Sequence, residues 1–214
     1  MHAAPVLRGG RVARSAWLVC GLFLCACGII AFLESDLGLS PWDVLHQGIA
    51  RHTPLSFGVA NELVAIVILL VAWLLGSRPG IGTVANAALI GLFVAVMQPL
   101  DLVQDLASWA LLPRALLLAF GLVLFGIGSA FYIGAALGAG PRDSLMLVGA
   151  RRSGVRIGIV RVALEGSALV AGAALGGTVG IGTLVFALLI GVAVESSFWL
   201  VIRLGLTETT EVGR

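Results

Sequence analysis

The segment LGLSPWD at residues 37–43 recurs as LGAGPRD at residues 137–143, one hundred positions further along the chain. In both copies the glycine permits a sharp backbone turn, and the proline suits the first position of a helix, where no amide donor is needed. The aspartate then falls at the third helical position, where its carboxylate can accept hydrogen bonds from free amides. Each copy therefore predicts the start of a short helix, over residues 41–51 and 141–151.

The similarity between the two copies extends over most of the chain. Residues 14–94 and 114–194 align without a gap and are identical at 26 of 81 positions. A shared apolar bias alone would give roughly 10% identity, so this similarity indicates an internal repeat. The sequence thus predicts one transmembrane domain with two repeats: residues 1–214 for the domain, 14–98 for repeat 1 and 113–203 for repeat 2.

The composition is that of a membrane protein. Of the 214 residues, 59% are hydrophobic and 11% are charged, and the mean hydropathy is +1.09. Soluble domains carry about 25% charged residues, so this chain has too little polar surface for a soluble enzyme and too much apolar surface for a disordered protein. The net charge of +2 provides no field that would attract a nucleic acid. The expected surroundings are therefore the lipid bilayer.

Six apolar runs are long enough to cross a bilayer, which requires about 20 mostly apolar residues. Three runs fall in each repeat: 15–33, 57–76, 81–98, 113–134, 157–176 and 181–203. The expected fold class is all-α, a polytopic membrane protein with six transmembrane helices. Because each repeat crosses the membrane an odd number of times, repeat 2 is inverted relative to repeat 1. Many secondary transporters are built in this way.

The distribution of charge supports the inverted arrangement. Arginines are concentrated before residue 15 and in the loop at 135–156, whereas the loops at 34–56 and 99–112 have an acidic bias. Loops on the cytoplasmic side of a membrane carry an excess of Lys and Arg. The pattern predicts a multi-pass protein of the inner (cytoplasmic) membrane with both termini in the cytoplasm.

Two placements are open for the short helices at 41–51 and 141–151. At about 1.5 Å per residue each is about 15 Å long, or half a bilayer. In one placement each helix lies on the membrane surface, with Trp42 and His46 on its apolar edge. In the other, each helix is re-entrant and its N-terminus lies in the membrane core, where irregular backbone is tolerated if protein buries it or water lines it. The apolar run at 145–148 favours insertion.

Polar side chains in the motifs and inside the spans form the candidate substrate or ion path. A charge at bilayer depth costs about 2.5–3.5 kcal/mol on insertion scales, so such residues usually face the bundle interior. Arg161 and Glu165 are four positions apart and can pair on one helix face, either as a structural ion pair or as part of a solute site. Thr83 and Thr183 each follow Gly-Ile-Gly and either cap a helix or line a pore. The complete set of candidates is Pro41, Trp42, Asp43, Glu62, Thr83, Pro141, Arg142, Asp143, Arg161, Glu165, Thr183 and Glu195.

These motifs resemble those of a known protein family. The segment LGLSPWDVL at 37–45 with Gly48, followed by SFG at 56–58 and GIGT at 80–83, is similar to the YczE/YyaS/YitT family of bacterial integral membrane proteins and is closest to its YczE-like branch. The resemblance covers residues 14–203. It implies a multi-span protein of the bacterial inner membrane, and it implies no substrate or mechanism.

Two functions from different classes remain open. The first is a small-solute transporter or channel with its site between the inverted repeats, the unknown solute being anionic or zwitterionic. The second is a non-transporting membrane scaffold or an accessory factor for another membrane process. A homo-oligomer is compatible with both. The sequence contains no arguable nucleophile–base pair and no metal-ligand cluster, so neither an enzymatic activity, nor a cofactor, nor a bound metal is expected.

Overall fold

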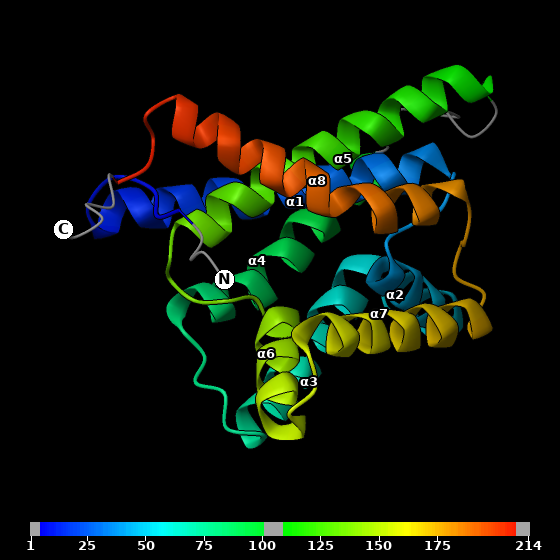
Figure 1. Cartoon of the computed structure of the whole chain (residues 1–214). Helices are drawn as coiled ribbons and strands as arrows, with labels where there is room; N and C mark the ends of the chain where they lie inside the picture. Colours follow the sequence, from blue (N-terminus) through cyan, green and yellow to red (C-terminus); the bar gives the residue numbers. More distant parts are fainter. Residues whose placement is uncertain (1–4, 101–108, 209–214) are drawn as a thin grey trace.

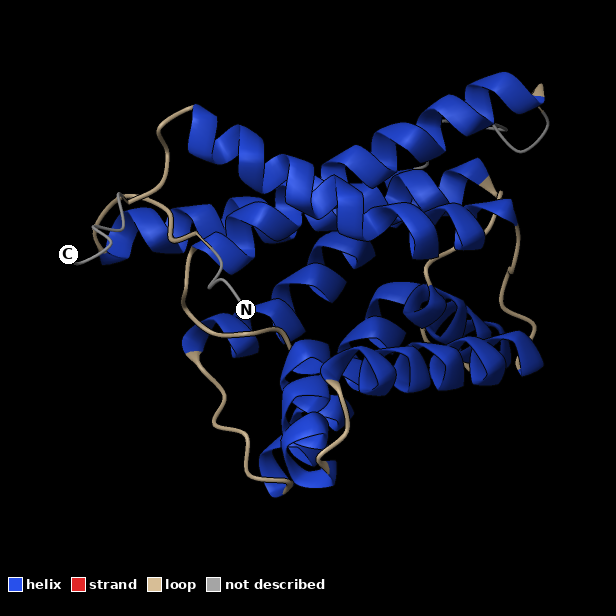
Figure 2. Cartoon of the chain, in the orientation of Figure 1, coloured by secondary structure: helices blue, strands red, loops and turns tan. Residues whose placement is uncertain are grey.

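The computed structural model describes residues 5–100 and 109–208, which form helices and connecting loops (Figures 1 and 2). The α-helices of these residues are α1 (Arg11–Ser35), α2 (Pro41–His52), α3 (Phe57–Leu74), α4 (Ile81–Met97), α5 (Leu111–Gly134), α6 (Pro141–Ser153), α7 (Ile157–Ala174) and α8 (Ile181–Arg203), and the 3₁₀ helix η1 (Gln98–Leu100) follows α4. Within the described ranges there is no strand, only an isolated bridge between Leu7 and Thr207. The predicted all-α class is confirmed for this part of the chain. Asp101 and Asp105, part of the acidic bias of the 99–112 loop, lie outside the described residues.

The order of helices repeats along the chain as the sequence does. Helices α5, α6, α7 and α8 each begin one hundred positions after α1, α2, α3 and α4, respectively. Both short helices begin at the prolines of the motif, Pro41 and Pro141, as predicted. Each repeat therefore consists of a long helix, a short helix and two further helices.

The motif glycines are required by the backbone and by close packing. Gly38 has a φ angle of 114° and Gly138 a φ angle of 134°, a region that side-chain-bearing residues rarely adopt. A Cβ atom at Gly38 would lie 2.6 Å from the backbone nitrogen of Gly180, and one at Gly138 would lie 2.8 Å from Oγ1 of Thr83. Each motif loop thus packs against the start of the last helix of the other repeat.

Five helices of the described residues are long and apolar enough to cross a membrane: α1, α3, α4 with η1, α5 and α8. Helix α7 covers the predicted span at 157–176 but is not among these five. It has 18 residues and carries the charged pair Arg161 and Glu165. The finding supports a multi-pass membrane protein, while a sixth crossing by α7 stays a prediction.

The helices form two layers. In Figure 1, α1, α5 and α8 lie side by side in the upper part of the molecule, and α2, α3, α6 and α7 form the lower part. Helix α4 passes between them and contacts α1 on one side and α3 on the other. Each repeat thus contributes helices to both layers.

Small residues bring the two longest helices together. A Cβ atom at Gly21 of α1 would lie 2.6 Å from the carbonyl oxygen of Gly128 of α5, and one at Gly28 would lie 2.9 Å from that of Gly121. Glycines at helix interfaces allow backbones to approach closely, which is how membrane helices gain packing energy. The α1–α5 contact therefore joins repeat 1 to repeat 2 through the middle of both helices.

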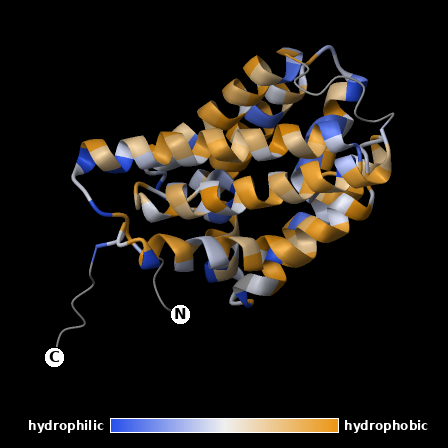
Figure 3. Ribbon diagram, turned by 90° about the horizontal axis from the view of Figure 1, so that it is seen from above, coloured by the Kyte–Doolittle hydropathy of each residue, from blue (hydrophilic) through white to orange (hydrophobic). Residues whose placement is uncertain are grey.

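The outer faces of the helices are apolar. Figure 3 shows hydrophobic residues along the exterior of the bundle, and side chains such as Leu74, Ile81 and Leu188 are more than three-quarters exposed. Large contiguous apolar surfaces are rare on soluble monomers. This exterior fits a lipid environment.

The short helices α2 and α6 are packed inside the helix bundle. Val44 and His46 of α2 are fully buried, so α2 does not have the two-faced exposure expected of a helix at the membrane surface. At the C-terminal end of α2, the Arg51 guanidinium donates to the carbonyl of Gly176 and, at 3.1 Å, to the hydroxyl of Thr178 in the α7–α8 turn. In α6 the equivalent Arg151 donates to the carbonyl of Gly76 in the α3–α4 turn. This packing fits the re-entrant alternative.

Candidate functional site

A cavity of about 280 Å³ lies between the two repeats. All eight α-helices line it, and the N-terminal ends of α2 and α6 both reach it. Its lining includes seven of the predicted path residues: Pro41, Trp42, Pro141, Arg142, Asp143, Arg161 and Glu165. Most of its remaining lining is aliphatic or aromatic, with a few serines and asparagines. Concave apolar sites with a few converging polar groups are the usual form of small-molecule sites.

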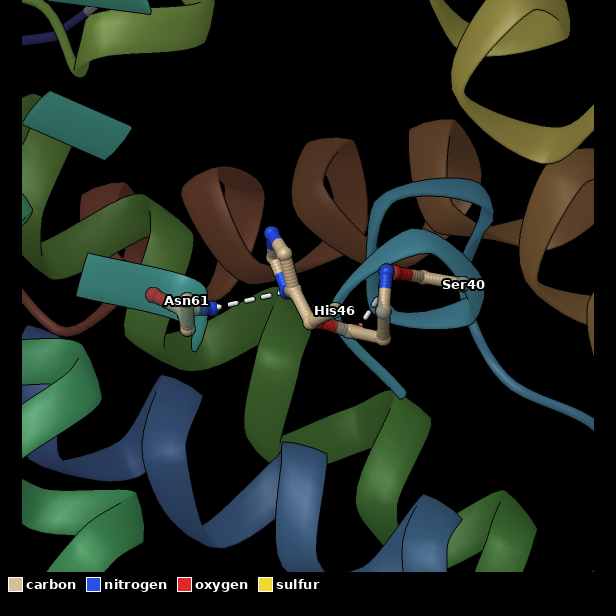
Figure 4. Close-up of polar contacts among 4 residues, drawn as sticks. Ser40, His46 and Asn61 are labelled. Atoms are coloured by element: carbon tan, nitrogen blue, oxygen red, sulfur yellow. Dashed lines mark hydrogen bonds and ion pairs between the residues drawn. The ribbon is translucent and has the colours of Figure 1, made fainter. Parts of the chain in front are cut away.

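A buried hydrogen-bond network holds the start of α2 (Figure 4). The hydroxyl of Ser40 donates to Oδ2 of Asp43 at 2.5 Å, and it caps the helix by accepting from the Asp43 amide at 3.3 Å. Nδ1 of His46 lies 3.2 Å from Oδ1 of Asp43 and 3.1 Å from Nδ2 of Asn61. All four residues are at least 96% buried. The network fixes the Asp43 carboxylate and ties α2 to α3.

The start of α6 is built differently. Gly140 and Met146 replace Ser40 and His46, so α6 has no side-chain cap at its N-terminus. Instead, the hydroxyl of Tyr132 on α5 donates to Oδ2 of Asp143 at 2.9 Å. The first turn of α6 therefore presents backbone amides without a side-chain acceptor next to the cavity.

Arg142 and Trp42 occupy equivalent positions in the two motifs and meet in the cavity. The guanidinium carbon of Arg142 lies 5.1 Å from the centre of the Trp42 ring system, a cation–π contact between repeats. Within the described residues the guanidinium has no hydrogen bond and no carboxylate within 4 Å. Arg142 and Asp143 thus bring charges of opposite sign to the cavity lining, and no ion pair within 4 Å joins them in the described residues.

The α7 wall of the cavity carries an ion pair. Nε of Arg161 donates to Oε1 of Glu165 at 2.9 Å, and the two side chains are 51% and 30% exposed. Their equivalents in repeat 1 are Asn61 and Ala65, so repeat 1 has no ion pair at the equivalent place. The predicted pairing is present in the structure.

The structure places the other predicted path residues outside the cavity lining. Asp43 lies behind the wall, in the network described above. Thr83 and Thr183 accept from the amides of Gly80 and Gly180 at 3.1 and 3.2 Å, which is the capping alternative. Two acidic side chains also lie away from the lining: Glu62 is half-buried against α4, and Glu195 is exposed on α8.

Several cavity residues were not singled out as path candidates by the sequence. Ser129 and Tyr132 of α5 line it, together with Asn61 of α3 and Asn86 of α4. The sequence does indicate the two asparagines, because polar residues inside apolar spans usually face the protein interior. Tyr132 is the one tyrosine in the sequence, but its contact with Asp143 depends on how α5 crosses α6, which no local pattern reveals.

The two repeats differ at one equivalent interface. In repeat 1, α3 packs against α4, and a Cβ atom at Gly58 would lie 2.7 Å from Cβ of Ala95. In repeat 2, α7 and α8 have no comparable contact, and a Cβ atom at Gly158 or Gly191 would meet nothing within 4 Å. Gly191 lines the cavity. The cavity wall is therefore tightly packed where α3 meets α4 and loosely packed between α7 and α8.

Among the described residues, no group of three or more His, Cys, Asp or Glu side chains is placed to hold a metal ion.

Comparisons with known proteins give a family but no activity. A model described as "Family of unknown function (DUF6198)" matches residues 12–197. The chain is 38% identical over 170 residues to an uncharacterized protein of Haemophilus influenzae, covering 79% of this chain and 76% of that protein. It is 31% identical over 188 residues to the uncharacterized membrane protein YczE of Bacillus subtilis, covering 87% and 86% of the two chains, and 28% identical over 166 residues to YyaS of the same organism, covering 77% and 82%. No solved structure matches the chain. The YczE/YyaS resemblance seen in the sequence is confirmed.

Proposed function

The chain belongs to the DUF6198 family of unknown function and is a YczE-like membrane protein, and from this premise we propose that it is a transporter or channel that moves a small solute across the bacterial inner membrane. The solute passes through the cavity between the two repeats. The protein moves it unchanged, without a catalysed reaction, a cofactor or a metal.

One observation carries this proposal: the N-terminal ends of both motif helices reach one cavity. Trp42 from α2 and Arg142 from α6 touch there, and the charged pair of α7 lines the same space. In transporters with inverted repeats, the solute site lies near the membrane midplane at the interface between repeats, and half-helix N-termini point at it. The geometry of this cavity supports such a site.

In this proposal α2 and α6 are re-entrant helices. Their N-terminal ends lie together in the membrane core, and their C-terminal ends return to opposite membrane faces through the contacts of Arg51 and Arg151 with the two inter-helix turns. Helix α7 then makes the sixth crossing, with its ion pair turned toward the cavity rather than the lipid. The arginine-rich loop at 135–156 and both termini lie in the cytoplasm.

A scaffold function is the second candidate, and one surface feature favours it. A shallow apolar hollow of about 360 Å³ lies on the outer side of α1, α4 and α5, with Leu24, Met97 and Phe120 among its lining residues. A partner membrane helix or a second copy of this chain would fit there. In that case the central cavity would be a packing defect and would conduct nothing.

Solute flux in proteoliposomes distinguishes the two candidates. The purified protein is reconstituted and screened for uptake of a panel of labelled metabolites. We expect uptake of at least one solute, and we expect Glu165→Gln, which breaks the ion pair in the cavity wall, to reduce it about tenfold or more. Glu208→Gln is the matched control, because Glu208 pairs with Arg14 away from the cavity. Uptake that is absent for every solute, or unchanged in Glu165→Gln, would contradict the transport proposal.

A further inference from the structure

We propose that the C-terminal end of α6 binds the phosphate group of an anionic phospholipid through four arginines, called the arginine cluster below. Arg151 and Arg152 lie in the last turn of α6, Arg78 lies in the α3–α4 turn, and Arg156 directly precedes α7. The inference concerns the surface of the protein rather than the central cavity, and it holds or fails independently of solute transport.

The arginine cluster forms where α6 meets the turn between α3 and α4 (Figure 1). Nη2 of Arg151 donates to the carbonyl oxygen of Gly76 in that turn at 3.2 Å. A Cβ atom at Gly76 would lie 3.9 Å from Nη2 of Arg151 and 3.9 Å from Nη2 of Arg152. Both guanidinium groups therefore lie over the same turn, and Arg78 follows Gly76 by two positions in it.

No carboxylate balances the arginine cluster in the part of the chain that the structure describes. The ion pairs found there involve Arg14, His46, Arg114 and Arg161, and none includes a member of the cluster. All four side chains of the cluster are exposed. Like charges held side by side repel one another, so the cluster favours an anion lying between them. Phosphate oxygens suit this place, because guanidinium groups bind them through paired hydrogen bonds.

The equivalent end of α2 shows that the fold does not require such a cluster. There the guanidinium of Arg51 donates to the hydroxyl of Thr178 at 3.1 Å, and the hydroxyl of Ser56 caps α3 by accepting from a backbone amide at 3.3 Å. The position equivalent to Thr178 holds Arg78, and the position equivalent to Ser56 holds Arg156. Two hydrogen-bond acceptors at one end are thus replaced by two cations at the other.

Arg156 lies at a helix end that disfavours a cation. It occupies the N-cap position of α7, which has no side-chain cap and no acidic residue in its first turn. The free amides and the dipole at a helix N-terminus favour an anion. The dipole of α6 accounts for Arg151 and Arg152 in its last turn, but the dipole of α7 works against Arg156. A bound phosphate would compensate both the amides of α7 and this side chain.

The surroundings of the arginine cluster favour a phospholipid over a free phosphate. Leu74 is 77% exposed just before the α3–α4 turn, and Ile159 is 59% exposed in the first turn of α7. The cluster therefore borders the apolar exterior of the helices. A phospholipid can place its phosphate among the arginines and its acyl chains against this exterior. Arginines gathered next to membrane spans are known to recognise anionic lipid headgroups.

Native mass spectrometry of the full chain in an uncharged detergent tests the inference. The added lipids are dioleoylphosphatidylglycerol, which is an anion, and dioleoylphosphatidylcholine, which has the same acyl chains and phosphate but also a cationic choline. We expect the first phosphatidylglycerol to bind about tenfold or more tightly than phosphatidylcholine. Equal binding of the two lipids would overturn the proposal and leave the arginines with a role in membrane orientation alone.

Two competitors distinguish a lipid from a soluble phosphate. Inorganic phosphate and glycerol 3-phosphate have the phosphate group without acyl chains. We expect neither to displace phosphatidylglycerol when added at the same concentration as the lipid. Displacement by either compound would assign the arginine cluster to a soluble phosphate and overturn the phospholipid proposal.

The variants separate the arginine cluster from total charge and from folding. Arg78→Gln with Arg152→Gln removes two charges, and the structure shows no hydrogen bond from either guanidinium to a described residue. We expect this double variant to bind phosphatidylglycerol about tenfold or more weakly. Arg78→Lys with Arg152→Lys keeps both charges without the planar forks and is expected to retain part of the affinity.

The matched control is Arg8→Gln with Arg11→Gln. It removes the same charge from two exposed positions near the N-terminus, on the membrane side predicted for the arginine cluster. We expect it to bind phosphatidylglycerol as the unmodified protein does. An equal loss of binding in the control and in Arg78→Gln with Arg152→Gln would show that diffuse charge attracts the lipid. Unchanged binding in Arg78→Gln with Arg152→Gln, in a sample that elutes as a single folded species, would also overturn the inference.

Discussion

At the scale of single residues, the two motif aspartates share a position and differ in their surroundings. Sequence reasoning could predict the helix starts at Pro41 and Pro141, because the cap and first-turn chemistry is local. It could not predict that His46 and Asn61 complete the network around Asp43, since that depends on how α2 packs against α3. The spacing of Arg161 and Glu165 did predict their ion pair.

Replacing Asp43 with asparagine tests whether its network stabilises the fold. Oδ2 of the carboxylate accepts from Ser40 and Oδ1 lies 3.2 Å from Nδ1 of His46, whereas an asparagine keeps only one of these two oxygens. A buried group that loses its partner costs about 1–3 kcal/mol. We expect Asp43→Asn to lower the thermal unfolding midpoint in detergent clearly. Asp36→Asn serves as control, since the Asp36 carboxylate is 54% exposed and 3.6 Å from Arg114. An equal midpoint for both variants would show that the network contributes nothing to stability.

At the scale of helices, the hundred-residue offset predicted the order and the starts of α5 to α8, because similar sequences have similar caps and periodicity. It did not predict the different packing of the two repeats. Gly58 and Gly91 have identical equivalents in Gly158 and Gly191, yet only the first pair lies in a tight interface. The same small residues permit close packing in both halves, and the global arrangement decides which half has it.

This difference predicts opposite outcomes for one substitution at two equivalent sites. Gly91→Ala places a methyl group against Glu62 and the backbone of Gly58, so α3 and α4 must separate. Gly191→Ala meets open space in a helix, where alanine is favoured over glycine by about 1 kcal/mol. We expect Gly91→Ala to lower the unfolding midpoint and Gly191→Ala to leave it unchanged or raise it. Equal destabilisation would contradict the looser packing of α7 against α8.

At the scale of the whole molecule, the inverted arrangement predicts that the α3–α4 and α7–α8 turns lie on opposite sides of the membrane. Single cysteines at Arg78 and Val179, in a background with Cys20, Cys25 and Cys27 replaced, report this in intact cells. Both positions are exposed. We expect a membrane-impermeant maleimide to label position 179 from outside and position 78 only after permeabilisation. Labelling of both from the same side would contradict the inverted repeat.

If the protein is a transporter with inverted repeats, as proposed, the same arrangement predicts a second conformation. If the repeats exchange roles, α7 packs against α8 as α3 now packs against α4, and the cavity opens on the other side. The contact between Glu62 and Gly91 then has its counterpart between Val162 and Gly191. Val162 is 71% exposed in the present structure, so this counterpart contact is not yet formed.

The most direct measurement of the central claim, that a solute crosses through a cavity gated by both repeats, is solute uptake in proteoliposomes with a disulfide between residues 162 and 191. The double variant Val162→Cys with Gly191→Cys is made in the background without the three native cysteines. We predict that oxidation forms the bridge and stops uptake, and that reduction restores it. Two results would contradict the account. The first is a disulfide that forms while uptake continues as fast as in the protein with free thiols. The second is a protein that transports the solute although the two thiols never form a disulfide.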